Sequence, residues 1–319
     1  MNTTAESIYE NICRSRNTLG MLPPEYSLPQ EEASAESKVR FADGALDGIA
    51  IYHMGVPAQD TALLEQALQI AATDPNEAHR LVQEWARDGH MVSAAGKMQK
   101  YVAAHQQELP PNPVYRLAVE CALKGTYREE VKFGLALLPL FETDQDEQLK
   151  NALRILALSD EFTLYVLPIA GRWMLSAQEV LRIAKNVQGW GRIHAVVQLE
   201  PENQEIADWL FTEGWDNTVL PAYSALECYQ KSGMRKHLEG TMTDRDYTSA
   251  CKLLQALLGE GPVPGISEVE DAEGLLDAFL TISASKAVSP ERQKTLESVA
   301  EHAKEQQMSR IAERAAALL

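Results

Sequence analysis

Apolar residues recur at helical spacing along most of the chain. From residue 61 onward they follow one another at intervals of three and four, which places them on one face of an α-helix. Clear examples are the runs Leu63, Leu64, Ala67, Leu68, Ala71 and Leu149, Leu153, Leu156, Ala157. The pattern predicts an all-α protein with more than about 60% of its residues in helices, well above the usual third.

Turn signals interrupt this pattern at spacings of 36, 35, 29 and 25 residues. They are Asp88-Gly89, Lys124-Gly125, Ser159-Asp160, Gln188-Gly189 and Glu213-Gly214. An apolar segment follows each turn, as expected for the second helix of a repeated helical pair. Because one pair cannot bury both of its faces, the sequence predicts a stack of helical hairpins.

The stack resembles two known helical-repeat architectures. One stretch resembles a degenerate tetratricopeptide unit at Ala118, Ala122, Gly125, Tyr127, Val131, Leu135 and Leu138, and a weaker resemblance involves Trp85, Gly89, Ala94 and Met98. Farther along, proline stands within helical patterns at Pro139, Pro168 and Pro221, where it would kink a helix. Kinked helices in irregular pairs are more similar to HEAT or armadillo repeats. The resemblance implies an irregular, HEAT-like α-solenoid that displays a concave binding surface, and it implies no catalytic residues.

Two segments lie outside the predicted array, which covers residues 58–259. In the N-terminal extension, 1–57, the sequence KVRFADGALDGIAIYHMG could form a short β-hairpin within 38–55 or a helix through ALDGIAIYHM. At the other end, Gly and Pro in GEGPVPGISEVE separate the array from a helical capping pair, 260–319. The last helix of that pair is expected to have Ser289 as its N-cap.

Charge narrows the range of partners. The 319-residue chain has 29 Lys and Arg against 46 Asp and Glu, a net charge of −17. Such a field repels nucleic-acid phosphates and anionic lipid head groups. We therefore expect a protein or peptide partner or a small anion, and neither a nucleic acid nor a membrane.

The compartment is predicted from two further features. The first residues, MNTTAESIYENICRSRN, lack the basic and apolar regions of a secretory signal, and no apolar run approaches the ~18 residues of a membrane span. The four cysteines are far apart and form no CxxC pair. These features predict a cytoplasmic protein with free thiols.

Motifs of the common enzyme classes do not occur in the sequence. The chain has no GxxxxGK[ST], GxSxG or HExxH motif and no GxGxxG after a strand pattern. Its seven histidines form no HxH or HxxxH pair, which excludes a metal site on a single helix. We expect no catalytic residue, metal or cofactor, although ligands from distant helices could still meet in the fold.

The most enzyme-like local group is formed by Asp43, Asp47 and His53. Two carboxylates and an imidazole in one loop can bind a divalent ion or transfer protons. The alternative is that the two Asp-Gly pairs provide turn geometry, and this interpretation is favoured.

Residues 150–194 form a basic island, with a local charge of +3 against −20 for the rest of the chain. Within it, GWGRIH combines a guanidinium, an indole and two glycines at a predicted helix start, a mixture that suits anion recognition. If the stack repeats every ~30 residues, arginines of this island converge on one groove. The predicted ligand-binding residues are Arg154, Arg172, Trp190, Arg192 and His194, with Trp215 and Asn217 at the edge of the groove.

A structural role for the same residues is the alternative. Trp190 could anchor the core between helix pairs, Arg192 could pair with an acid such as Glu202 or Glu205, and His194 could be a buried imidazole.

The leading hypothesis is therefore a non-enzymatic interaction scaffold whose central basic concave face binds an acidic peptide, a protein segment or a small anion. One alternative is an enzyme with a pocket between repeats, in which Asp43, His53 or His194 transfers protons. A carboxylate beside His194 would favour that alternative. The other is a nucleic-acid enzyme of the helical-repeat glycosylase type, against which the overall charge argues.

Overall fold

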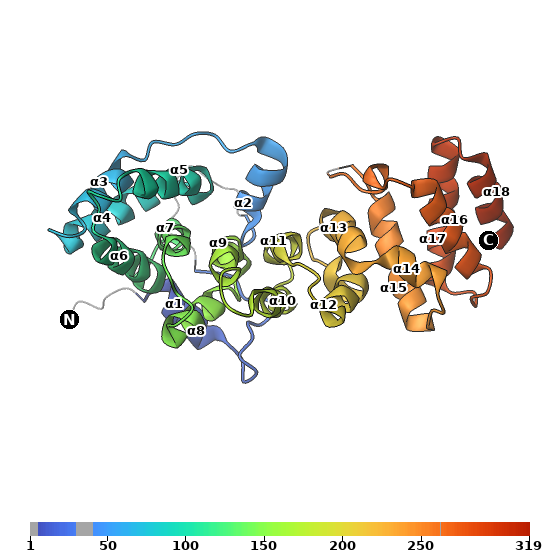
Figure 1. Ribbon diagram of the computed structural model, residues 1–319, viewed down its shortest axis with the longest axis horizontal. Helices are drawn as coiled ribbons and strands as arrows, with labels where there is room; N and C mark the ends of the chain where they lie inside the picture. The colour runs from blue at the N-terminus through green and yellow to red at the C-terminus, as the bar shows by residue number, and fades with distance from the viewer. Residues whose placement is uncertain (1–5, 30–40, 262) are drawn as a thin grey trace. The chain divides into compact units, whose positions relative to one another are not determined.

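The computed structural model describes residues 6–29, 41–261 and 263–319, and it contains no strand in these ranges (Figure 1). Helices account for 68% of the residues, which confirms the predicted all-α class. The chain divides into two compact units, Met1–Ala195 (unit 1) and Val196–Leu319 (unit 2). The predicted division at residues 57 and 259 stays a prediction.

Unit 1 consists of consecutive short helices. They are α1 (Ile8–Ser15), α2 (Ala45–Ile49), α3 (Ala62–Ile70), α4 (Pro75–Ala86), α5 (Met91–Ala104), α6 (Pro111–Lys124), α7 (Arg128–Leu137), α8 (Glu147–Leu156), α9 (Asp160–Ala170), α10 (Ser176–Asn186) and the start of α11 (Trp190–Gln198). A π-helical turn, Ala50–Met54, continues α2.

Helix α7 is the centre of unit 1. Every residue from Glu129 to Leu137 is buried, and the helix packs against α4, α5, α6 and α9 (Figure 1). Among these buried residues are three charged ones, Glu129, Glu130 and Lys132. Since a buried charge is costly without a partner, the helices around α7 have to supply polar groups to it.

Unit 2 contains the remaining helices. They are α12 (Gln204–Trp209) with the π-helical turn Leu210–Gly214, α13 (Ala222–Ser232), α14 (Met234–Glu239), α15 (Asp244–Leu258), α16 (Ala272–Ser283), α17 (Pro290–Glu305) and α18 (Ser309–Leu318). The N-cap prediction for α17 is confirmed, because the Ser289 side chain accepts a hydrogen bond from the Arg292 amide at 3.2 Å. The sequence did not predict the third helix of this segment, α18, which packs on α16 and α17.

The predicted hairpin within residues 38–55 is wrong for the part that the structure describes, residues 41–55. Gly44, with φ of +75°, turns the chain into α2, and the helix alternative through ALDGIAIYHM is confirmed. The physical reason is tertiary packing. Asp47 and Gly48 are buried against α7, α9 and Trp190, which outweighs the strand propensity of the β-branched and aromatic residues. Residues 38–40 lie outside the described residues.

Four of the five predicted turns lie at boundaries between successive helices, and the fifth, Glu213-Gly214, ends the π-helical turn Leu210–Gly214. Of the three prolines expected within helices, Pro168 does lie inside one, α9. The expectation is wrong for the other two, because Pro139 lies in the 3₁₀ turn that follows α7 and Pro221 is the N-cap of α13. The cysteines Cys13, Cys121, Cys228 and Cys251 are free thiols, as predicted.

Candidate anion-binding pocket

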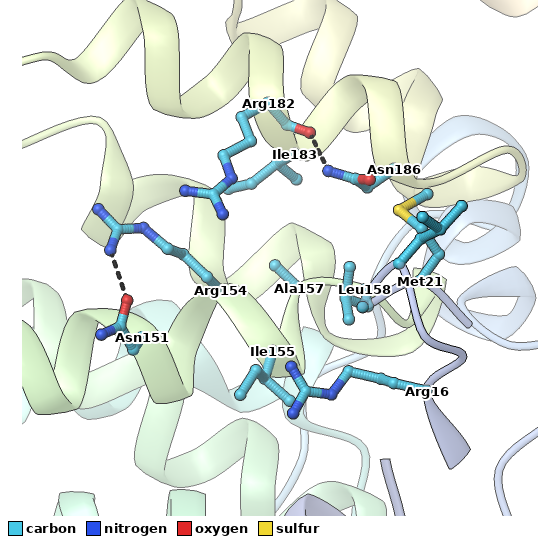
Figure 2. A pocket seen from close by; sticks show the side chains of 12 residues that line it. Arg16, Met21, Asn151, Arg154, Ile155, Ala157, Leu158, Arg182, Ile183 and Asn186 are labelled. Atoms are coloured by element: carbon cyan, nitrogen blue, oxygen red, sulfur yellow. Dashed lines mark hydrogen bonds between the residues drawn. The ribbon is translucent and has the colours of Figure 1, made fainter. Parts of the chain in front are cut away.

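A pocket of about 280 Å³ lies in unit 1 between the chain after α1 and helices α8 and α10 (Figure 2). Its lining contains three arginines, two asparagines and no carboxylate. The residues, which we call the basic pocket, are Arg16, Leu19, Gly20, Met21, Asn151, Arg154, Ile155, Ala157, Leu158, Arg182, Ile183 and Asn186. The volume is close to the lower end of the range for small-molecule sites, about 300–1,000 Å³.

Arg154 is the arginine of the basic pocket that a carboxylate already holds in place. Its Nε and Nη2 donate to the two carboxylate oxygens of Glu179 at 3.0 and 2.5 Å, and Nη1 donates to the Asn151 side chain at 2.8 Å. The hydrogen bonds to Glu179 raise the pKa of Arg154. A two-pronged contact of this kind fixes the guanidinium plane and offsets its charge.

The excess positive charge of the pocket comes from Arg16 and Arg182. Within the described part of the chain, neither guanidinium is paired with a carboxylate. Arg16 follows the last residue of α1 and Arg182 extends from α10, so the two approach the pocket from different segments (Figure 2).

A short turn holds the chain beside Arg16. The Asn17 side-chain oxygen accepts hydrogen bonds from the amides of Leu19 at 2.9 Å and Met21 at 3.1 Å, and Gly20 has a φ of +79°. In this arrangement the Asn side chain provides a hydrogen-bond acceptor for backbone amides that lie outside any helix or strand. The turn therefore presents Leu19, 85% exposed, at the edge of the pocket.

Apolar side chains complete the lining. Ile155 of α8, Leu158 in the turn after it, Ile183 of α10 and Met21 of the turn beside Arg16 line the pocket together with the arginines (Figure 2). The pocket therefore combines guanidinium groups with an apolar wall. That combination suits a ligand that carries an anionic group and an apolar group side by side.

The other two predicted arginines do not line the basic pocket. Arg172 pairs with Glu142 at 3.1 Å and donates to the Pro139 carbonyl. The Nε of Arg192 donates to the carbonyls of Val187 at 2.8 Å and Ala184 at 3.2 Å, at the end of α10. Arg154, Arg172 and Arg192 thus do not share this site, and the ligand-binding roles of the last two stay predictions.

The GWGRIH turn is fixed to the rest of unit 1 by backbone hydrogen bonds. Asp160, the first residue of α9, accepts from the amides of Gly189 at 3.0 Å and Gly191 at 2.6 Å. Burial raises the pKa of Asp160 to about 6. The helix-start amides that could receive a ligand anion are therefore partly occupied by a carboxylate of the protein.

Trp190 and His194 lie in an aromatic cluster with Tyr52. The ring centroids of Tyr52 are 5.8 Å from Trp190 and 6.1 Å from His194. Burial lowers the pKa of His194 to about 4, and its Nε2 has no hydrogen-bond partner within the described residues. The carboxylate neighbour that would favour the enzyme alternative is not seen at His194 in those residues.

The local group of Asp43, Asp47 and His53 is divided among different partners. Asp43 pairs with Arg128 at 3.0 Å and accepts from the Leu28 amide at 3.1 Å, while Asp47 pairs with Lys132 at 2.9 Å. His53 is exposed on the π-helical turn that follows α2. Gly44 has the positive φ that the turn interpretation predicts, but Gly48 lies within α2.

Trp215 and Asn217 lie in unit 2 and are both buried. The Trp215 indole donates to the Phe211 carbonyl at 3.1 Å. The Asn217 side-chain oxygen accepts from the amides of Val219 at 3.1 Å and Leu220 at 2.8 Å. Both side chains thus satisfy local backbone groups, and their predicted binding role is untested.

The sequence analysis does not include Arg16 or Arg182 among the predicted ligand-binding residues, although both line the basic pocket with Arg154. Arg182 was counted in the basic island, and its position on the exposed face of an amphipathic helix was the available signal. Arg16 is far away in sequence and reaches the pocket through tertiary packing of α1 on α8, for which the sequence carries no local signal.

Comparison with known proteins gives no significant match, whether to protein-family models, to curated proteins or to solved structures. No helix in the described ranges is both long enough and apolar enough to cross a bilayer.

Proposed function

We propose that this protein is a non-enzymatic interaction scaffold that binds an acidic segment of a protein partner in the basic pocket. The observation that carries the proposal is the presence of Arg16, Arg154 and Arg182 around a pocket without a carboxylate, in a chain with a net charge of −17. Most of the surface of so acidic a protein would repel an anionic partner. A pocket lined by arginines without Asp or Glu is a local region that could attract one.

Electrostatics support an anionic occupant. Arg16 and Arg182 repel each other across the pocket, and no carboxylate in the lining offsets that repulsion. A carboxylate from a partner would receive charge-assisted hydrogen bonds, which are about twice as strong as neutral ones. Glu179 holds Arg154 in one orientation, so Arg154 would form a rigid part of the lining and offer only its remaining N–H groups to the partner.

The apolar lining favours a peptide over a small inorganic anion. Leu19, Met21 and Ile183 offer no hydrogen bonds, so a free anion would gain nothing from them. An Asp or Glu side chain with an apolar neighbour would use both parts of the pocket. We therefore propose a segment in which acidic and apolar residues alternate.

The helical packing is consistent with a HEAT-like solenoid as the scaffold. Contacts between neighbours in sequence, α3 with α4, α6 with α7, α8 with α9 and α9 with α10, are those of stacked hairpins. The pair α6 and α7 contains the residues that resemble a tetratricopeptide unit. The four free cysteines agree with the reducing environment of the cytoplasm, where we place the protein.

Fluorescence anisotropy with a labelled peptide tests the proposal. The probe alternates Asp and Glu with Leu, and a second peptide carries Asn and Gln in place of the acids. We expect the acidic peptide to bind and the neutral one to bind at least tenfold more weakly. Arg182→Ala and Arg16→Ala should each weaken binding about 5- to 150-fold, as expected for the loss of a contact worth roughly 1–3 kcal/mol.

Arg116→Ala is the matched control. Arg116 is exposed on α6 and lies outside the basic pocket, and its replacement by Ala removes the same charge as the pocket variants do. It should leave the affinity unchanged, while added salt should weaken binding to the parent protein. Equal affinities for the Arg182→Ala and Arg116→Ala variants, or equal binding of the neutral peptide, would refute the proposal. Competition by inorganic phosphate as strong as by the acidic peptide would show that the site takes small anions instead.

A further inference from the structure

A second cluster of reactive side chains lies outside the basic pocket, where α7 packs against α4 and α6. His79 of α4, Cys121 of α6 and Glu130 of α7 each offer a ligand atom, and these atoms all lie within 4.8 Å of one another. The three helices pack directly against one another. The ligands are thus held by the core of unit 1 and not by a loop.

Glu130 is completely buried and held in a fixed orientation. Its Oε2 accepts hydrogen bonds from the backbone amides of Thr126 at 3.0 Å and Tyr127 at 3.4 Å, at the start of α7. Its Oε1 faces His79 and accepts from the Gln83 side chain at 3.3 Å. One oxygen thus anchors the side chain and the other is directed at the cluster, as in metal sites whose ligands are oriented by outer hydrogen bonds.

His79 and Cys121 are the other two residues of the cluster. The His79 Nε2 is in hydrogen-bond contact with the Glu130 carboxylate, and its side chain is 20% exposed. The Cys121 side chain is fully buried. The cluster is therefore closed on the thiol side and open to solvent on the imidazole side.

From this geometry we propose that His79, Cys121 and Glu130 form a binding site for a divalent metal ion, with zinc as the ion that the ligand set favours. Thiolate, imidazole and carboxylate together are typical of Zn²⁺, because hard ions such as Mg²⁺ and Ca²⁺ avoid sulfur. One thiolate and one carboxylate balance the two charges of the ion, so the loaded site is neutral in a buried environment.

Binding requires a small local rearrangement. Zinc bond lengths and a tetrahedral angle place ligand atoms roughly 3.3–3.8 Å apart. The His79 imidazole therefore moves off the Glu130 carboxylate to admit the ion between them. The thiol proton is released to solvent as the thiolate forms. The solvent-exposed side at His79 leaves the fourth position to a water molecule.

The sequence predicts no metal here because the ligands are scattered. His79 and Glu130 are 51 positions apart, and no short motif contains two of the three residues. The expectation of no metal site rested on motifs within single helices. Three packed helices supply the ligands that no single one contains.

Cobalt provides a spectroscopic test on the full chain, after chelator treatment and removal of any affinity tag. Titration with Co²⁺ should give a thiolate-to-cobalt charge-transfer band and visible bands of a four-coordinate ion, both saturating at one equivalent. One equivalent of Zn²⁺ should abolish them. His79→Ala should weaken Co²⁺ binding at least tenfold, and Cys121→Ala should abolish the charge-transfer band.

Cys251→Ala is the matched control, because Cys251 is a buried thiol outside the cluster. It should leave the Co²⁺ spectrum unchanged. Thermal unfolding gives an independent measurement in case a core variant folds poorly: Zn²⁺ should raise the midpoint of the parent and of Cys251→Ala but not of His79→Ala, whose side chain is partly exposed. Absence of a thiolate band in the parent, or equal metal binding by the His79→Ala and parent proteins, would overturn the proposal.

Discussion

The indole ring of Trp190 lies so close to the backbone of Gly48 that a Cβ atom on Gly48 would come within 2.1 Å of the ring. The contact joins the start of α11 to α2, two segments that are far apart in sequence. Trp190 is only 6% exposed, so it contributes a large apolar surface to the interior of unit 1. The contact therefore supports the interpretation of Trp190 as a core anchor.

This contact predicts the effect of Gly48→Ala. The added methyl group has no space, and either α2 or the indole must move. We expect a loss of roughly 1–3 kcal/mol of unfolding free energy, typical of an overpacked core. Chemical denaturation followed by circular dichroism measures it.

Gly96→Ala is the control for Gly48→Ala. Gly96 lies inside α5 and is exposed, with no atom within 4 Å of an added Cβ. Because Ala is the better helix former, this variant should be more stable than the parent by up to about 1 kcal/mol. A Gly48→Ala protein that is also as stable as the parent would show that the indole is not fixed against α2.

His194 predicts a pH dependence of stability. Burial lowers the pKa of its imidazole from 6.5 to about 4 in the folded protein. Between these values the unfolded chain binds a proton that the folded chain does not, so this residue's contribution to stability is present above pH 6.5 and is lost as the pH falls toward 4. For the His194→Phe variant, the loss of unfolding free energy between pH 7 and pH 4.5 should be smaller than for the parent by about 2–3 kcal/mol.

His90→Phe controls for a general effect of removing a histidine. His90 is exposed to solvent at the start of α5. Its replacement should leave the pH dependence of the parent in place. If His194→Phe and the parent lose stability in parallel on acidification, then the imidazole is not protected from protons in the folded state.

Helix content and several helix boundaries were predictable because they depend on local signals. Ser289 as an N-cap and the buried stripe of Leu296 and Val299 follow from residue type and spacing alone. The same spacing predicts that Leu138, Leu156, Leu167, Val196 and Leu226 are buried. The first four are buried, but Leu226 is only half-buried. The error at Leu226 shows that spacing locates a helix face without fixing how much of it a neighbour covers.

The sites were less predictable because they depend on contacts between distant segments. Arg16 lines the same pocket as Arg182 only because α1 packs on α8, and His79 meets Glu130 across two packed helices. The sequence does show that residues 150–194 are basic, and two of the three pocket arginines, Arg154 and Arg182, come from that island. The sequence does not show which arginines of the island form hydrogen bonds or ion pairs within the protein.

Arg192 allows the binding and structural interpretations of the basic island to be separated. Its Nε donates to the carbonyls of Val187 and Ala184, two buried residues at the end of α10. Arg192→Ala leaves these carbonyls without that donor, so we expect a loss of roughly 1–3 kcal/mol of stability. The affinity for the acidic peptide should not change, because Arg192 does not line the basic pocket. Weaker peptide binding at unchanged stability would instead assign Arg192 to the ligand.

Lys132 predicts the largest effect of a single substitution. Its ammonium group is 1% exposed and contacts Glu161 at 2.6 Å, Glu129 at 2.8 Å and Asp47 at 2.9 Å. Burial raises the pKa of Glu129, whereas the Lys132 charge helps to hold the pKa of Glu161 below its usual value.

Lys132→Met removes the cation that these three carboxylates share and leaves buried acids without it. Breaking a buried ion pair from one side costs about 3–5 kcal/mol. Because the Lys132 charge helps to hold the pKa of Glu161 below its usual value, the loss should be complete near neutral pH and should shrink as the pH falls and the Glu161 carboxyl takes up a proton. Lys97→Met makes the same chemical change in an exposed pair with Glu65, and it should cost less than about 1 kcal/mol. Thermal and urea unfolding of the two variants side by side measure the contrast, and equal losses would mean that the buried carboxylates do not depend on Lys132 for their charge balance.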